Sequence, residues 1–217
     1  SDSFTFLAND GAADSNVATV SITVQRAPTP VSWTALVGVS ATGSTIRKSA
    51  ATGWGNGGAV SSAVIPGDGG VDFRADETNT YRICGLSVSN VDANYTAINY
   101  GLLLGADASV QVYENGALRG AFGTYITGDR VSVERTGTRV VYKKNGTVLY
   151  TSAVASSGNL MVDAAVYTLG GTIADTNIAG GMAPPNQAPV AASQTVTVNY
   201  STSSGTVCTP YVWQSSP

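Results

Sequence analysis

The sequence predicts an all-β fold, an antiparallel β-sandwich of the jelly-roll type with extra strand segments at both ends. Apolar and polar residues alternate with a period of two along most of the chain, and no helical periodicity runs longer than about two turns. The candidate strands are short and closely spaced, which is typical of sandwiches and barrels. Asn115-Gly116 and Asn145-Gly146 each separate two alternating segments, and Asn-Gly supplies the positive φ angles of a type I′ hairpin turn.

Two segments rich in Pro, Gly and Ala divide the chain into a central block and two flanks. The segments cover residues 26–30 and 180–189, and their composition predicts linkers. They enclose a block over residues 31–179. Its candidate strands are 33–39, 45–48, 71–74, 81–86, 98–104, 110–114, 130–135, 139–144, 147–152, 160–168 and 172–178.

The flanks carry strand patterns as well. In residues 1–25, Phe4 and Phe6 share one face of a candidate strand, and a second alternating segment follows at 18–25. Residues 190–217 open with the alternating QTVTVNY and then lose the pattern. Neither flank is long enough to bury a core alone, so we expect one complete sandwich domain with two incomplete ends.

The composition excludes several classes of protein. The chain has 217 residues, 11 Lys and Arg, 14 Asp and Glu, and no His. Its net charge of −3 argues against nucleic acid as a partner, and it has no run of 18 apolar residues, which argues against membrane insertion. Without His, neither a Ser-His-Asp triad nor an HExxH zinc site can form.

The two cysteines leave two alternatives open. Cys84 and Cys208 form a disulfide only in an oxidising compartment. Cys84 lies in the apolar run YRICGL, which favours a buried free thiol over a disulfide.

The flanks resemble parts of known surface repeats. DSFTFLANDGAADSNVATVSITVQ resembles the closing strands of a bacterial cadherin-like or Ig-like repeat, and NQAPVAASQTVTVNYSTSSG resembles the opening strand of another. The resemblance implies a long secreted or cell-surface protein of tandem modules, from which this chain is a mature or excised fragment.

The central block resembles a concanavalin A-like lectin/glucanase sandwich, near the SPRY and LamG groups. The resemblance rests on GGVDF, YRICGLS, INYGLLLGADASVQVYENG, TYITGDRVSVERTGTRVVYKKNGTVLYTS and LMVDAAVY. In that family, a run such as Gly128-Asp129 to Asn145-Gly146 with its flanking strands forms neighbouring strands of one curved sheet. The family includes lectins, adhesion modules and glycoside hydrolases, so the fold alone does not fix the function.

The carboxylates do not form the acid pair of a glycosidase. Glycosidases place two carboxyl groups about 5–10 Å apart, and hydrolases of the resembling fold usually present Glu-x-Asp-x-x-Glu on a strand, a triplet that is absent here. Asp129 and Glu134 are expected to point to opposite faces of a strand, and the adjacent Asp76 and Glu77 also diverge. We therefore expect no enzyme activity.

Two loops carry the hard oxygen ligands that calcium prefers. Asp92 and Asn94 lie in SNVDANYT, and Asp10 and Asp14 lie in the first hairpin. Asp and Asn also accept hydrogen bonds from their own backbone in Asx turns. We expect Asx turns, with calcium as the alternative and no other cofactor.

A sugar site needs an aromatic face beside polar groups, because a sugar ring has apolar and polar faces. Trp54 with Asn56 is one candidate ligand site, and Asp92, Asn94 and Tyr95 are the other. Trp54 is also a candidate core residue or loop anchor.

A third surface candidate is basic. Arg135, Arg139, Lys143 and Lys144 lie on two successive candidate strands, and we expect at least two of them to face solvent together. They either attract an acidic glycan or anionic surface or protect the strands as a solvated face.

Two functions follow. The first is a non-catalytic, lectin-like adhesion or carbohydrate-binding module of a secreted or surface-anchored bacterial protein, with a glycan or cell-surface ligand. The second is a structural subunit of an extracellular filament, in which the terminal strands of one copy complete those of another.

Overall fold

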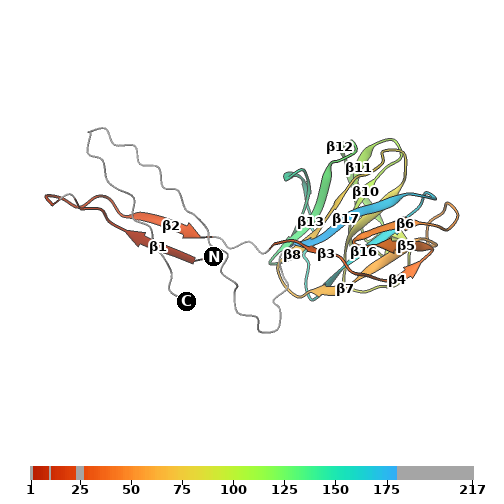
Figure 1. Ribbon diagram of the computed structural model, residues 1–217, viewed down its shortest axis with the longest axis horizontal. Coiled ribbons are helices and arrows are strands. Elements are labelled where there is room, and N and C mark those ends of the chain that lie inside the picture. The colour runs from red at the N-terminus through yellow and green to blue at the C-terminus, as the bar shows by residue number, and fades with distance from the viewer. Residues whose placement is uncertain (1, 10, 23–26, 180–217) are drawn as a thin grey trace. The chain divides into compact units, whose positions relative to one another are not determined.

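The computed structural model describes residues 2–9, 11–22 and 27–179, which form strands and one 3₁₀ turn, η1 (Tyr95–Ala97) (Figure 1). No helix among these residues is long and apolar enough to span a membrane. Asp10, Cys208, the linker at 180–189 and the flank at 190–217 were all part of the predictions but lie outside the described residues.

The first sheet of the central domain has seven antiparallel strands in the order β12-β11-β10-β9-β16-β7-β4. Four of its strands are consecutive in both sequence and space, whereas β16 inserts between β9 and β7. The strands are β4 (Trp33–Val37), β7 (Gly58–Ile65), β9 (Arg82–Ser87), β10 (Tyr100–Leu104), β11 (Ser109–Glu114), β12 (Ala117–Thr124) and β16 (Leu160–Val166).

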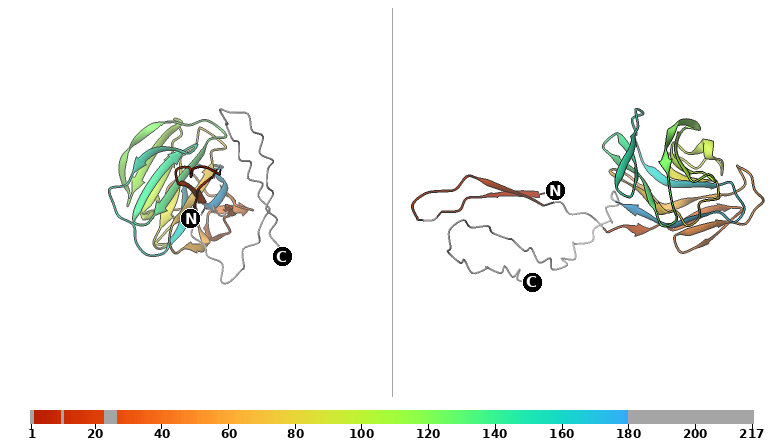
Figure 2. Two further views of the ribbon diagram at one scale, coloured as in Figure 1. Left: turned by 90° about the vertical axis from the view of Figure 1, so that its left-hand side faces the viewer. Right: turned by 90° about the horizontal axis from the view of Figure 1, so that it is seen from above.

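The second sheet has the order β15-β14-β13-β8-β17-β6-β5, and β3 (Thr29–Pro30) also pairs with β17. All its pairings are antiparallel. Its other strands are β5 (Val39–Thr42), β6 (Thr45–Lys48), β8 (Gly69–Arg74), β13 (Arg130–Thr136), β14 (Arg139–Lys144), β15 (Thr147–Thr151) and β17 (Thr172–Ala179). The two sheets face each other (Figure 2), which confirms the predicted antiparallel jelly-roll sandwich.

The core lies between the inner faces of the two sheets, as the period-two alternation predicts. Along β11, Val110 and Val112 are buried while their neighbours are partly exposed. Facing them from the second sheet are residues such as Val133 of β13. Cys84 of β9 is also in this core, as a fully buried free cysteine, and burial raises the pKa of its thiol.

Both predicted Asn-Gly hairpins are present. Asn115 and Gly116 have φ angles of 50° and 77° between β11 and β12, and Asn145 and Gly146 have 48° and 79° between β14 and β15. Asn tolerates this left-handed backbone better than most residues, and Gly adopts it freely.

Several predicted strands were wrong in extent. The predicted strand at 33–39 is two strands, because the chain leaves the first sheet after β4 and enters the second at β5 through Gly38, whose φ is +53°. A Cβ at Gly38 would lie 2.1 Å from the Asn56 carbonyl oxygen, so only glycine fits this crossing. Residues 29–30, predicted as part of a linker, instead pair with β17. Strands β7 and β12 were not predicted, because GAVSSAVI and ALRGAFGT do not alternate cleanly.

We expected at least two of the four residues of the basic hairpin to face solvent together, and two of them do. Arg139 and Lys143 lie on the outer face of β14, but Lys143 pairs with Glu134. Arg135 points inward, is 3% exposed, and donates hydrogen bonds to backbone carbonyls, among them those of Ile65 and Gly158. Its position in β13, alternating with buried valines, places it on the inner face.

The N-terminal residues form a separate hairpin of β1 (Asp2–Phe6) and β2 (Ala18–Ile22). Phe4 pairs with Val20 and Phe6 with Ala18. The phenylalanines are 52% and 47% exposed, so this ribbon leaves an aromatic face open to solvent.

Candidate ligand-binding pocket

The loop at 88–99, which joins β9 to β10, lies over the outer face of the seven-stranded sheet. Tyr95 and Ile98 of this loop pack with Ile83 and Leu103, which alternate with the core residues of β9 and β10. Asn99 fixes the ends of the loop: its Oδ1 accepts the Val88 N–H at 2.8 Å, and its Nδ2 donates to Asn115 Oδ1 at 2.7 Å. The loop is therefore a packed part of the domain.

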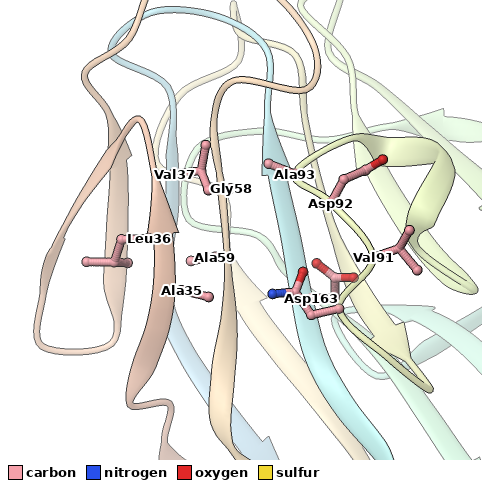
Figure 3. Close-up of a pocket in the computed structure, with 10 residues that line it drawn as sticks. Ala35, Leu36, Val37, Gly58, Ala59, Val91, Asp92, Ala93 and Asp163 are labelled. Carbon is pink, nitrogen blue, oxygen red and sulfur yellow. The ribbon is translucent and has the colours of Figure 1, made fainter.

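A pocket of about 320 Å³ opens between this loop and the edge strand β4 (Figure 3). Its lining is mostly apolar, with three polar side chains. The lining residues are Ala35, Leu36, Val37, Gly58, Ala59, Asn90, Val91, Asp92, Ala93 and Asp163.

Two irregularities in strand pairing occur beside the pocket. The register between β4 and β7 shifts between Thr34 and Val37, and Ala35 in this stretch has a φ of 49°. The register between β16 and β7 shifts between Met161 and Asp163. β-Bulges of this kind bend a strand and re-aim its side chains, and they occur often at functional sites.

Asp163 is the buried polar group of the pocket. It alternates with the core residues Val162 and Ala164, so its side chain leaves β16 on the outer face, toward the loop that carries Val91 and Asp92 (Figure 3). It is 2% exposed, and its Oδ2 accepts a hydrogen bond from Ser87 Oγ at 2.8 Å.

Burial raises the pKa of Asp163 to about 6. Hydrogen bonds from Ser87 and from the Ala164 N–H lower it, and the nearby Asp92 raises it further. A carboxyl group with a raised pKa in a concave site is a good candidate for a functional residue.

Trp54 and Tyr95, predicted in different candidate sites, are in contact with each other. Their ring centroids are 4.9 Å apart, and a row of rings extends from them to Tyr167, Tyr81 and Tyr113. We call these five residues the aromatic row. Trp54, Tyr95 and Tyr113 pack on the apolar outer face of the sheet, so Trp54 anchors its loop and also presents a partly exposed ring.

The other predicted ligand residues make hydrogen bonds within the chain. Asn56 accepts from Lys48 Nζ and donates to the Ala51 carbonyl. Asp92 Oδ1 accepts the Asn94 N–H at 2.7 Å, and Asn94 caps η1. Asp92 still lines the pocket, whereas Asn56 and Asn94 serve their own loops, so ligand contact by those two stays a prediction.

Among the candidate calcium ligands, Asp92 and Asn94 lie in the Asx turns that we expected, with calcium binding as the alternative. Asp92 bonds the backbone two residues on, and in the first hairpin Asn9 donates to Asp14 at 2.6 Å while it accepts the Gly11 N–H. Over residues 2–9, 11–22 and 27–179, no group of three or more His, Cys, Asp or Glu side chains comes together as a metal site. Calcium binding therefore stays a prediction.

The adjacent acidic pair considered for catalysis, Asp76 and Glu77, has separate partners. Asp76 pairs with Arg74, whereas Glu77 accepts from the Thr172 backbone and hydroxyl. Sequence reasoning missed Asp163 altogether. The signal was present, because an Asp in the apolar strand LMVDAAVY requires an explanation.

Neither protein-family models nor curated proteins match this sequence. Solved structures do match. The lumenal domain of VIP36, in a form bound to Ca²⁺ and Man2, has a TM-score of 0.50 at 6% identity, over 71% of this chain and 83% of that one. The central domain has the concanavalin A-like lectin/glucanase fold.

Two further solved structures are similar to this chain. The SPRY domain of human HERC1 has a TM-score of 0.47 at 17% identity, over 62% of this chain and 86% of that one. Carbohydrate-binding module CBM66 from Bacillus subtilis has a TM-score of 0.40 at 13% identity, over 70% and 91%. An alginate lyase and a sialidase are also among the similar structures, with TM-scores of 0.37 and 0.39.

Proposed function

We propose that this chain is a non-catalytic, lectin-like module of an extracellular bacterial protein, and that it binds a glycan in the Asp163 pocket. The observation that carries the proposal is one buried carboxylate at an apolar pocket on the outer face of the sheet. Pockets for small molecules are typically about 300–1,000 Å³, mostly apolar, with a few polar groups that orient the ligand. At about 320 Å³ the pocket suits one sugar ring.

The two kinds of surface in the pocket match the two kinds of surface on a sugar. Leu36 and Val37 offer apolar contact to the C–H face of a ring. Asp163 and Asp92 accept hydrogen bonds from hydroxyl groups, and an ionised carboxylate makes these bonds stronger. The aromatic row, which includes Tyr95 of the 88–99 loop, offers partly exposed rings to further residues of a longer glycan.

Isothermal titration calorimetry after a glycan-array screen tests this proposal. Asp163→Asn keeps the shape of the side chain and removes its charge, and we expect it to weaken glycan binding about tenfold or more. Asp76→Asn removes an equal charge from the loop after β8 and should bind as the wild type does. The proposal is wrong if no glycan binds, or if Asp163→Asn binds as tightly as the wild type.

The N-terminal hairpin favours a second function, a filament subunit joined by strand exchange. A two-stranded ribbon is marginally stable alone, and Phe4, Phe6 and Leu7 are all about half exposed. A strand from another copy would cover this face, and a head-to-tail contact that does not close gives a fibre. Light scattering and electron microscopy of the full chain test it. Fibres that disappear in Phe4→Ser/Phe6→Ser support strand exchange, and a monodisperse monomer rules it out.

A further inference from the structure

The pocket has an unbalanced charge. Its lining includes Asp92 and Asp163, and none of the described residues that line it is Lys or Arg. The two elements on which Asp163 packs, β7 and β9, place only Gly58, Val60, Gly85 and Ser87 beside it on the outer face. Apart from Asp92, the titratable group nearby is Cys84, which lies on the opposite face of the sheet.

Lys48, whose Nζ lies close to Gly57, cannot neutralise these acids. Its ammonium donates to the Gly53 carbonyl, Asn56 Oδ1 and the Val166 carbonyl, each at 2.6 Å. A Lys ammonium has three donors, and all three are used by these oxygens. Lys48 therefore stabilises the fold and has no donor left for a group in the pocket.

Asp163 itself also lacks a cationic partner. Among the described side chains, none forms an ion pair with it within 4.0 Å. Its donors are the neutral Ser87 hydroxyl and the Ala164 N–H. A buried carboxylate without a compensating charge is unfavourable, and a cationic group in the pocket would relieve it, whereas an anionic ligand would add a third negative charge.

We infer that the pocket selects its sugar by charge: it takes an amino sugar with a free ammonium group and rejects acidic sugars. The inference rests on the proposed glycan-binding function. The ammonium would donate to Asp163 and Asp92, and the ring would pack on Leu36 and Val37. A lysine side chain offers the same ammonium but lacks the ring, so it is the natural competitor to compare.

Calorimetry at pH 7 with four probes tests the inference: glucosamine, N-acetylglucosamine, glucuronic acid and Nα-acetyl-lysine methyl ester. We expect glucosamine to bind at least tenfold tighter than N-acetylglucosamine, which has the same ring without the charge, and glucuronic acid not to bind. Asp163→Asn should lose most of the preference for glucosamine over N-acetylglucosamine, while Asp76→Asn keeps the preference. If Asp163→Asn does not fold, Ser87→Ala replaces it. This variant removes the hydrogen bond to the Asp163 carboxylate and should change the preference for glucosamine over N-acetylglucosamine.

The outcomes separate this inference from the proposed function. Binding of N-acetylglucosamine or glucuronic acid as tightly as glucosamine overturns the selection by charge but leaves a glycan-binding module. Tighter binding of the lysine ester than of glucosamine overturns the assignment to a sugar. Absence of binding to every probe, together with an empty glycan array, overturns both. A further expected result is that glucosamine affinity falls between pH 7 and pH 5 in the wild type, because Asp163 becomes protonated.

Discussion

Lys48 Nζ lies 2.6 Å from Asn56 Oδ1, inside the sandwich. This hydrogen bond is one of three by which the Lys48 ammonium joins separate parts of the molecule. Lys48 ends β6 of the second sheet, and its ammonium also bonds the Val166 carbonyl at the end of β16 in the first sheet. The ammonium also donates to the Gly53 carbonyl, and Gly53 and Asn56 lie on either side of Trp54 in the sequence. One buried cation thus connects both sheets and fixes the loop that carries the aromatic row.

We predict that Lys48→Met lowers the free energy of unfolding by about 2–4 kcal/mol, because it leaves several buried oxygens without donors. Urea denaturation followed by circular dichroism measures the change. Lys144→Met removes an exposed hydrogen bond to the Thr124 carbonyl and should cost under about 1 kcal/mol. Equal stability of Lys48→Met and the wild type would show that these contacts are dispensable.

The raised pKa of Asp163 predicts a pH-dependent stability. An unfolded Asp has a pKa near 4 and the folded one about 6, so between these values the folded chain binds more protons than the unfolded chain. Stability contributed by this group therefore falls as pH rises through that window, by roughly 2–3 kcal/mol in total.

Asp163→Asn isolates this effect. We expect the variant to gain stability relative to the wild type as pH increases from 4 to 7, with no further gain above about pH 7. Urea titrations of both proteins at each pH give the difference, in which the other carboxylates cancel. A difference that does not change with pH would contradict the raised pKa.

The aromatic row predicts a structural as well as a ligand-binding effect at Trp54. Trp54→Ala removes ring contacts with Tyr95 and Tyr167, and we expect a loss of about 2–4 kcal/mol of stability. Trp54→Phe keeps a ring and should lose less than half of that. Thermal unfolding measures both. If glycan affinity drops in Trp54→Phe while stability is kept, the ring contacts the ligand; an unchanged stability of Trp54→Ala would show that the row does not anchor the loop.

Gly85 lies where strands β9 and β10 approach each other closely, under the 88–99 loop. A Cβ there would lie 1.9 Å from the Tyr100 carbonyl oxygen of β10. We expect Gly85→Ala to destabilise the domain by about 2 kcal/mol or more, as overpacking does. Gly67→Ala, where a Cβ meets nothing within 4 Å, is the matched control and should be close to neutral in the same denaturation experiment.

The sequence predicted the sandwich because its local signals agree with the final fold. Alternation along β11 and β13 and the two Asn-Gly turns depend on neighbouring residues, so they could be recognised directly. The strand at Gly58–Ile65 escaped prediction because its pairing on both sides, with β16 and β4, comes from distant parts of the chain. Tertiary packing, rather than its own pattern, makes this segment a strand.

Only some residues of the candidate site were predicted from the sequence. Asp92 and Tyr95 were identified from their loop, and the structure places Asp92 in the pocket and Tyr95 in the aromatic row. Asp163, which lies 71 positions after Asp92 in the sequence, could not be joined to it without the strand order that sets β16 beside β9. The inward position of Arg135 could not be predicted for a related reason: its charge is satisfied by backbone carbonyls at the end of β7, in the loop after β7 and in the loop before β16.

Strand β4 is bulged and lies at the edge of its sheet. Its residues 35–37 form one wall of the pocket and are not part of the hydrophobic core. Leu36 and Val37 are both nearly half exposed, whereas Val162 and Ala164 on either side of Asp163 are buried. Substitutions at 35–37 would therefore reshape one side of the cavity without disturbing the packing that stabilises the sandwich. Under the proposed function, a lineage carrying this domain could change its ligand preference through a few edge residues and keep the same carboxylate, Asp163.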